Sequence, residues 1–278
     1  MGFEENLLFY LTFAAYGIAS LLYISYVGTK NSTTAKVAFY VVAFGVVVNT
    51  AAMALRGYIG GYVPLSNGYE FLLAFSWGIA FVYLVTEWKY KVPITGAFVI
   101  PIAWLLLAYV AILMPVEYKV ARPLMPALQS NWLTYHVLTA QFGYGAFAFS
   151  FGAGIMYLIK ERAIKLNREI GLAAKLPSLE TLDQLGYRLI AVGFPLLTLC
   201  IITGAIWAEY AWGRYWSWDP KETWSLITWL VYAVYLHARF TYGWKGKKAA
   251  ILAIIGFIAV LFTFFGVNYF LSGLHSYA

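Results

Sequence analysis

A chain of 278 residues that is 62% hydrophobic, 19% aromatic and only 11% charged has more apolar side chains than one soluble core can bury. Soluble domains carry roughly 25% charged residues, so this composition and a mean hydropathy of +0.72 exclude soluble enzymes and disordered proteins. The net charge of +7 would suit nucleic acid only if the basic residues shared one soluble face, whereas membrane proteins place Lys and Arg in cytoplasmic loops.

Eight stretches are long and apolar enough to cross about 30 Å of hydrocarbon, which takes about 20 helical residues. The sequence therefore predicts an all-α polytopic membrane protein, with residues 1–278 forming one integral membrane domain. The first stretch is expected to remain as a span, because Glu4 and Glu5 replace the basic start of a signal peptide. The predicted spans are Leu7–Val27, Val37–Leu55, Tyr69–Thr86, Ile94–Met114, Tyr135–Ile159, Leu185–Ala208, Thr223–Tyr242 and Ala249–Leu271.

The basic residues predict the orientation of these spans. Fourteen of the nineteen Lys and Arg residues lie in or beside the connections that follow the first, third, fifth and seventh spans. By the positive-inside rule these connections are expected to be cytoplasmic, with both termini external. The longest of them, residues 160–183, mixes basic and apolar residues and predicts a short amphipathic surface helix. Contact with lipid or a partner and a solvated connector are both open interpretations of this segment.

The fifth predicted span contains many small residues, among them Gly143, Gly145, Gly152 and Gly154. Small residues allow helices to approach closely in lipid, so this span is expected to make close helix contacts. Approach to a flat ligand is the second interpretation.

An external loop at residues 210–224 holds four tryptophans within thirteen residues. Tryptophans are enriched at membrane interfaces, and Asp219, Pro220 and Glu222 fit a helix N-cap with a capping box. These two effects explain each residue singly, but they explain less well why the indoles gather in one loop. Indoles offer broad apolar faces to a large flat ligand such as a porphyrin. The composition leaves both interpretations open.

The run from Trp212 to Trp224, WGRYWSWDPKETW, resembles the WWD signature of the haem-handling proteins of cytochrome c maturation. It is closer to the CcsA/ResC family of system II than to the related CcmC or CcmF proteins. Residues 64–70, 126–137 and 225–237 also resemble that family, so the resemblance covers most of the chain.

The resemblance implies that haem b is carried across the membrane and presented externally. There its vinyl groups would be attached to the thiols of the CxxCH segment of apocytochrome c. It further implies a holocytochrome-c synthase of the haem lyase type, a CcsB-type partner, and a bacterial cytoplasmic or plastid thylakoid membrane.

The chain has only three histidines, and its single cysteine, Cys200, can form no internal disulfide, CxxC pair or cysteine-based zinc site. His136 and His275 fall at the outer ends of the fifth and eighth spans, on the side of the tryptophan loop. Neutral imidazole is a common axial ligand of haem iron. A lone interfacial histidine is usually solvated or hydrogen-bonded, but two on this side favour ligation, and the resemblance implies the same role.

His237 lies about fourteen residues into the seventh span, roughly 21 Å below the outer surface at 1.5 Å per residue. Ionisable residues at such depth are functional candidates, although a merely hydrogen-bonded histidine is also possible. The resemblance implies a transmembrane haem ligand at this position. The sequence has no second intramembrane histidine, so the other ligand is expected from the CcsB-type partner.

The remaining predicted site residues position the haem. Stacking on Trp212, Trp216 and Trp218 would orient the vinyl groups, and Asp219 would shape the loop as its cap. The cations available for haem propionates, together with the outward-facing helix starts, are Arg56, Arg214 and Lys221.

Three other functions compete with this prediction. A CcmC-like protein would deliver haem without attaching it, but eight spans and His237 argue against it. A b-type electron-transfer cytochrome needs two facing intramembrane histidines for each haem. A solute transporter usually shows an internal repeat and a polar path at the midplane, and neither is evident.

Overall fold

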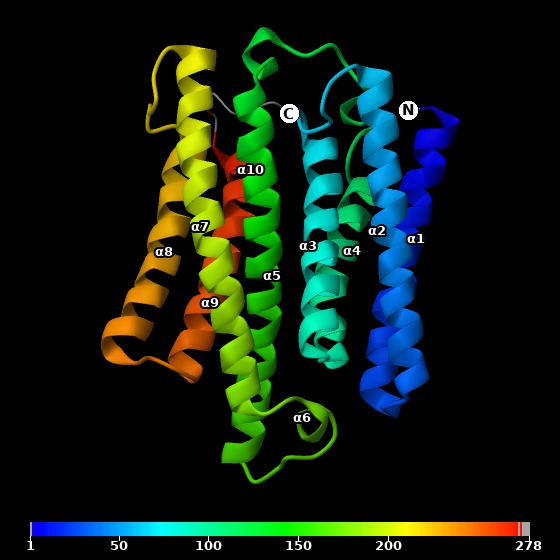
Figure 1. The fold of residues 1–278 in the computed structure, drawn as a ribbon, viewed down its shortest axis with the longest axis vertical. Coiled ribbons are helices and arrows are strands. Elements are labelled where there is room, and N and C mark those ends of the chain that lie inside the picture. Colours follow the sequence, from blue (N-terminus) through cyan, green and yellow to red (C-terminus); the bar gives the residue numbers. More distant parts are fainter. Residues whose placement is uncertain (1, 272, 274–278) are drawn as a thin grey trace.

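The computed structural model describes residues 2–271 and 273, and within them the chain is a bundle of long helices with no β-strand (Figure 1). The helices in chain order are α1 (Phe3–Thr29), α2 (Ser32–Gly60), α3 (Gly68–Tyr90), η1 (Pro93–Thr95), α4 (Gly96–Ile112), η2 (Val116–Tyr118), η3 (Pro126–Leu128), α5 (Asn131–Lys165), α6 (Leu172–Lys175), α7 (Leu179–Trp212), α8 (Pro220–Tyr242), α9 (Lys247–Leu261), η4 (Phe262–Gly266) and α10 (Val267–Phe270). The all-α polytopic prediction is therefore confirmed.

Each of the eight predicted spans coincides with a long helical segment, and seven of these segments are both long and apolar enough to cross a membrane. The exception is α8, which has the length but carries Lys221, Glu222, His237 and Arg239 among its 23 residues. The seventh predicted span, Thr223–Tyr242, therefore remains a prediction, because α8 combines a polar start with a polar inner end.

The connector at residues 160–183 differs from the amphipathic helix that its composition predicts. α5 continues to Lys165 and α7 begins at Leu179, so that only the single turn α6 is helical between them. The buried ammonium of Lys160 donates to the carbonyls of Ala173 and Leu176 at 3.3 and 3.1 Å and pairs with Glu169 at 2.7 Å. This lysine folds the connector back on α5 in place of a longer helix.

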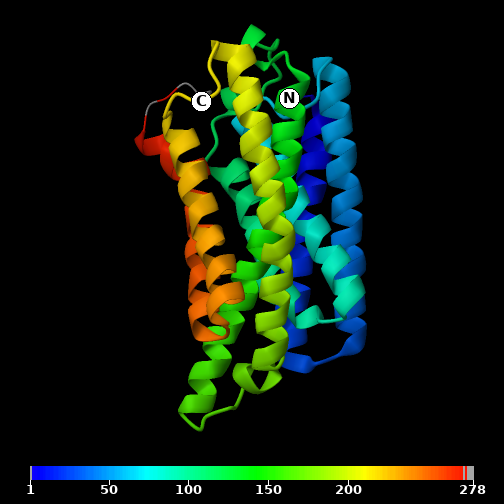
Figure 2. The same cartoon turned by 60° about the vertical axis from the view of Figure 1, so that its left-hand side comes forward.

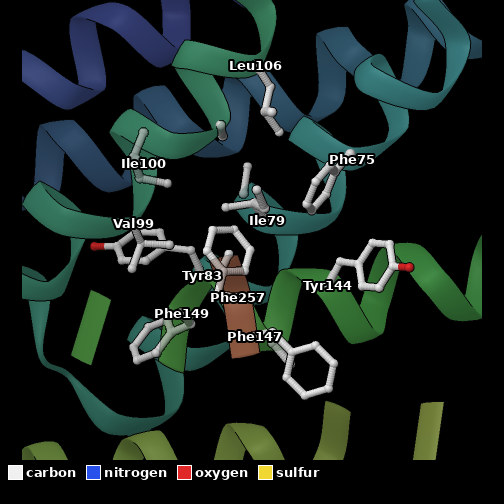
Figure 3. Packing of buried hydrophobic residues seen from close by; sticks show 14 of the residues in the cluster. Phe75, Ile79, Tyr83, Val99, Ile100, Leu106, Tyr144, Phe147, Phe149 and Phe257 are labelled. Carbon is white, nitrogen blue, oxygen red and sulfur yellow. The ribbon is translucent and has the colours of Figure 1, made fainter. Parts of the chain in front are cut away.

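α5 and α7 lie between a group formed by α1–α4 and a group formed by α8–α10 (Figures 1 and 2). The start of α1, the end of α10 and residues 213–219 lie at one end of the bundle, here called the tryptophan end. The turn between α1 and α2 and the connector with α6 lie at the other, basic end. Figure 3 shows the core between the groups, where aromatic side chains of α3, α5 and α9 interlock.

Glycines on α5 and its neighbours bring the backbones into close contact. A Cβ atom at Gly145 would lie 2.7 Å from the carbonyl oxygen of Gly78 on α3, and one at Gly154 would lie 3.0 Å from that of Ala250 on α9. At Gly193 on α7, a Cβ would lie 2.7 Å from the ring of Phe147. The expected close helix contacts of this span are confirmed, and α5 is the helix around which the two groups assemble.

We predict that Gly145→Ala destabilises the protein by about 1–3 kcal/mol, because the new methyl group would press on a backbone that cannot rotate away. Gly28→Ala in α1 is the matched control, since a Cβ there has no neighbour within 4 Å. Thermal unfolding of the two variants in detergent measures the difference. Equal melting temperatures would contradict the close α3–α5 contact.

Candidate functional site

A cavity of about 480 Å³ opens at the tryptophan end. Its volume falls within the range of small-molecule sites. One wall is mainly apolar and comes from α3, α4 and the segment that follows α4: Phe71, Leu72, Tyr109, Leu113 and Met114. The lining from α8, η4 and α10 combines the polar residues Lys221, Glu222, Ser225, Thr263 and Asn268 with the aromatic residues Phe264, Phe265 and Tyr269.

His136, near the start of α5, faces this cavity. Its Nδ1 lies 2.7 Å from the carbonyl oxygen of Cys200 on α7. A carbonyl only accepts hydrogen bonds, so Nδ1 carries the proton and Nε2 of the neutral ring has the lone pair that binds metals. The ring also stacks on Trp207, with centroids 6.0 Å apart. The structure thus orients this imidazole in the tautomer that an axial ligand needs.

Gly204 on α7 makes room for the His136 ring, because a Cβ at Gly204 would lie 2.6 Å from Nδ1. Cys200 supplies its backbone carbonyl here, and its thiol is buried with Sγ 3.5 Å from Nδ1. Trp207 is buried as well, and its Nε1 donates to the carbonyl of Ala127 at 2.8 Å. These supports leave no signal in the local sequence, since their partners are about 60 to 80 residues away along the chain.

The predicted tryptophans take different places. Trp216 lines the cavity, whereas Trp212 packs against Trp207 with ring centroids 5.1 Å apart. Trp218 is 69% exposed, meets the edge of Trp216 at 5.7 Å, and has a left-handed backbone with φ +60°. Such a backbone conformation is unusual for a bulky residue and is typical of strained functional loops. Of the three, only Trp216 is placed directly in the cavity wall.

A capping box at the start of α8 holds this loop, as the sequence predicts. Asp219 accepts from the N–H of Lys221 at 3.0 Å, and the carboxylate of Glu222 accepts from the N–H groups of Ser217 and Asp219 at 2.8 and 3.0 Å. The hydroxyl of Ser217 also donates to Glu222. Burial lowers the pKa of Lys221, in the polar first turn, to about 8, although Asp219 opposes the shift.

The N-terminus of α3 forms another part of the cavity rim through Ser66, Asn67 and Gly68. Asn67 caps α3 by accepting from the N–H of Glu70 at 3.0 Å. The fully buried carboxylate of Glu70 accepts from the N–H and the hydroxyl of Ser66, both at 2.8 Å. Two helix starts therefore border the cavity, and a glutamate fixes the backbone ahead of each.

Arg56 does not take the propionate-binding place expected of it. It is 1% exposed, and its guanidinium pairs with Glu70 at 2.9 Å and with Glu5 at 3.2 Å. It also donates to the carbonyl of Lys119 at 2.9 Å. Arg56 joins α1, α2 and α3 beneath the rim, since two buried carboxylates need a cation close by.

Two other predicted ligands, Arg214 and His237, lie apart from His136. Arg214 is exposed and is absent from the cavity lining. His237 is exposed on the outer face of α8, within 3.5 Å of the Thr241 hydroxyl. His275 lies outside the described residues. Within the described ranges no three His, Cys, Asp or Glu side chains gather in a metal-binding cluster.

The fold and the cavity define a class: a polytopic helical membrane protein with a large, mostly apolar pocket and one oriented imidazole in its wall. Comparison with known proteins identifies the family within that class. The family model described as Cytochrome C assembly protein matches residues 65–275, and the chain belongs to this family.

Curated relatives narrow the similarity and confirm the resemblance to the CcsA family. The chain is 41% identical over 263 residues to cytochrome c biogenesis protein CcsA of Pyropia yezoensis, covering 82% of each chain. It is 39% identical over 271 residues to CcsA of Microcystis aeruginosa, covering 82% of this chain and 83% of the relative.

Among solved structures, the fold is similar to that of cytochrome c haem lyase CcmF, with a TM-score of 0.68 and 18% sequence identity. The match covers 94% of this chain but only 46% of the CcmF chain, so this chain spans about half the length of that protein. At this identity the similarity concerns the fold.

We predict that Glu222→Ala loosens the tryptophan loop, because two backbone N–H groups and one hydroxyl lose their acceptor. A loss of about 1–2 kcal/mol corresponds to about 5- to 30-fold more open loop. The measurement is the rate of trypsin cleavage after Arg214 in the purified protein. Glu117→Ala, an exposed glutamate at the same end of the bundle, is the control. A cleavage rate like that of the control would show that Glu222 does not hold the loop.

Proposed function

We propose that this chain binds haem b as substrate in the 480 Å³ cavity and attaches it to the CxxCH thiols of apocytochrome c. This activity is that of a system II holocytochrome-c synthase, or haem lyase. The observation that carries the proposal is the His136 imidazole, oriented by the Cys200 carbonyl and facing a mostly apolar cavity beside the tryptophan loop. Membership of the cytochrome c assembly family supports it.

The axial positions of the iron are assigned to His136 and His275. Nε2 of His136 is the nitrogen prepared for coordination. His275 belongs to the segment matched by the family model, although it lies outside the described residues. Two imidazoles would hold the haem until the histidine of the CxxCH segment displaces one of them, so that ligand exchange is part of turnover.

Attachment requires positioning more than proton chemistry. The sulfur of each cysteine bonds to one vinyl carbon while the thiol proton moves to the other, so the addition is redox-neutral. Trp216 in the cavity wall, with Trp218 at its edge, orients the haem, and Asp219 holds the loop. Trp212 packs against Trp207, which stacks with the His136 ring. Holding thiol and vinyl together replaces a bimolecular encounter. The cysteines must arrive reduced, since a chain with one cysteine offers no dithiol pair.

Cationic side chains would receive the propionates. Lys221 lines the cavity, and its half-buried ammonium is suited to a carboxylate. Arg214 stands exposed on the neighbouring loop and would meet a propionate that reaches the cavity mouth.

His237 would bind haem at an earlier stage, within the membrane. Its exposure on the outer face of α8 supports a site shared with another chain, because a ligand from a CcsB-type partner can approach it there. In this proposal the tryptophan end faces the periplasm or the thylakoid lumen. The Lys- and Arg-rich connections then lie on the cytoplasmic or stromal side.

Two other functions remain as alternatives. A CcmC-like protein would present haem in the same cavity without attaching it. A b-type electron-transfer cytochrome would keep its haem, and the exposed position of His237 disfavours it because no facing histidine lies on the described part of the chain.

We predict that haem purified with the protein depends on His136. His136→Gly should lose the low-spin bands of the cavity haem, and added imidazole should restore them, because imidazole can occupy the space left by the side chain. His237→Ala removes a histidine that lies outside the cavity, so this variant should keep the low-spin bands. Unchanged spectra in both His136→Gly and His275→Ala would refute the cavity site.

We also predict covalent attachment in a reconstituted system. Co-expression with a CxxCH reporter and a CcsB-type partner should give a reporter that retains haem in a denaturing gel, because two thioether bonds survive denaturation. Trp216→Ala should lower the yield about 10-fold or more, by loss of positioning, whereas Trp88→Ala, exposed at the basic end, should not. Bound haem without any covalent product would favour the delivery function.

A further inference from the structure

The last membrane helix changes its register beside the cavity. Between α9 and α10, residues Phe262–Gly266 form a single π-helical turn, η4. A π-turn inserts one extra residue into a helical turn and is frequent at functional sites. Gly266 permits it, because a Cβ at this position would collide with the ring of Phe262. The turn places Phe264 flat against Phe71 of α3, with centroids 4.5 Å apart, and sets the direction of the residues that follow.

Asn268, the second residue of α10, lines the cavity after this turn. Its Oδ1 is buried and has no hydrogen-bond partner among the residues that the structure describes. Buried polar atoms are nearly always paired, because an unpaired one has lost its water without replacement. The neighbouring hydroxyls of this wall are already used: Ser225 donates to the carbonyl of Glu222 at 2.7 Å, and Thr263 to that of Ala259 at 2.8 Å.

We propose that the carboxamide of Asn268 binds a carboxyl group of the cavity's ligand, namely a porphyrin propionate. This assignment rests on the proposed function and goes beyond it by naming a neutral group that recognises the ligand. A carboxamide accepts through Oδ1 and donates through Nδ2, which matches a carboxylic acid at two points. Rotation by half a turn about Cβ–Cγ presents the NH₂ group to an ionised carboxylate.

The shape of the cavity makes this contact directional. Asn268 lies among the polar lining residues Lys221, Glu222, Ser225 and Thr263, whereas the lining from α4 and the residues just after it is apolar at Tyr109, Leu113 and Met114. A porphyrin of the b type has two propionates at one edge and its vinyl groups on the other half of its periphery. Carboxyl binding at Asn268 therefore directs the vinyl groups away from this polar cluster.

The test compares haem b with its dimethyl ester, which has the same ring and vinyl groups but no free carboxyl. Each is titrated into the detergent-purified full chain and followed by its Soret band. The parent should bind haem b about tenfold more tightly than the ester, the effect of a hydrogen bond to a charged group. In Asn268→Leu the preference should fall to about twofold, the part that Lys221 and Arg214 retain, because leucine has the same branched skeleton as asparagine but forms no hydrogen bond.

Two further variants make the outcome specific. Asn268→Asp keeps the volume and polarity of the side chain and serves if the leucine variant fails to fold. It should weaken the binding of haem b more than the binding of the ester, because the introduced carboxylate and the propionate repel each other. Asn6→Leu is the matched control: it makes the same substitution at an exposed position of α1 at the same end of the bundle, outside the cavity lining, so its preference should equal that of the parent.

An unchanged preference for haem b over its ester in Asn268→Leu would overturn this assignment alone. The same holds if that variant kept the preference but lost affinity for a CxxCH peptide. Absence of His136-dependent haem binding in the parent would overturn the proposed function itself, and this assignment with it.

Discussion

Close backbone contact along α5 is the constraint on which the architecture depends. Between helices in lipid there is little hydrophobic driving force, so packing and hydrogen bonds must hold the bundle together. Gly145 and Gly154 on α5 allow α3 and α9 to approach without intervening side chains, and Gly193 on α7 makes room for Phe147. Because α5 also carries His136, the helix that unites the two groups is the one that positions the imidazole.

The rim of the cavity uses one device twice. At the start of α3 and again at the start of α8, a side chain caps the helix while a glutamate three residues later binds backbone N–H groups ahead of it, at Glu70 and Glu222. The carboxylate of each glutamate accepts hydrogen bonds from the protein backbone. The positive ends of the two helix dipoles therefore border the cavity, while both carboxylates are bound to the protein. The rim is rigid where a ligand's polar edge would arrive.

Much of this could be predicted from local sequence. The apolar stretches, the capping box at Asp219 and the small residues of α5 are signals that lie within one helix. Contacts between distant segments could not be predicted. The pairing of Arg56 with Glu5 and Glu70, the Cys200 carbonyl on His136, and the burial of Asn268 Oδ1 without a partner among the described residues all depend on tertiary packing. The connector at residues 160–183 differs from its prediction for the same reason. Hydrogen bonds from the buried Lys160 hold it as a loop with one helical turn instead of the expected amphipathic helix.

The length of α5 has a consequence for the basic end. Its 35 residues extend about 52 Å at 1.5 Å per residue, more than the roughly 40–45 Å of a bilayer with its headgroups. With its start at one interface, α5 emerges beyond the opposite headgroups, and its last turns project below the rest of the bundle (Figures 1 and 2). The connector turns back from there to the end of α1, where the ammonium of Lys30 donates to the carbonyl of Lys175 at 2.7 Å and Lys175 donates to the carbonyl of Gly28. The connector therefore joins α5 and α7 to the first helix of the α1–α4 group at the basic end.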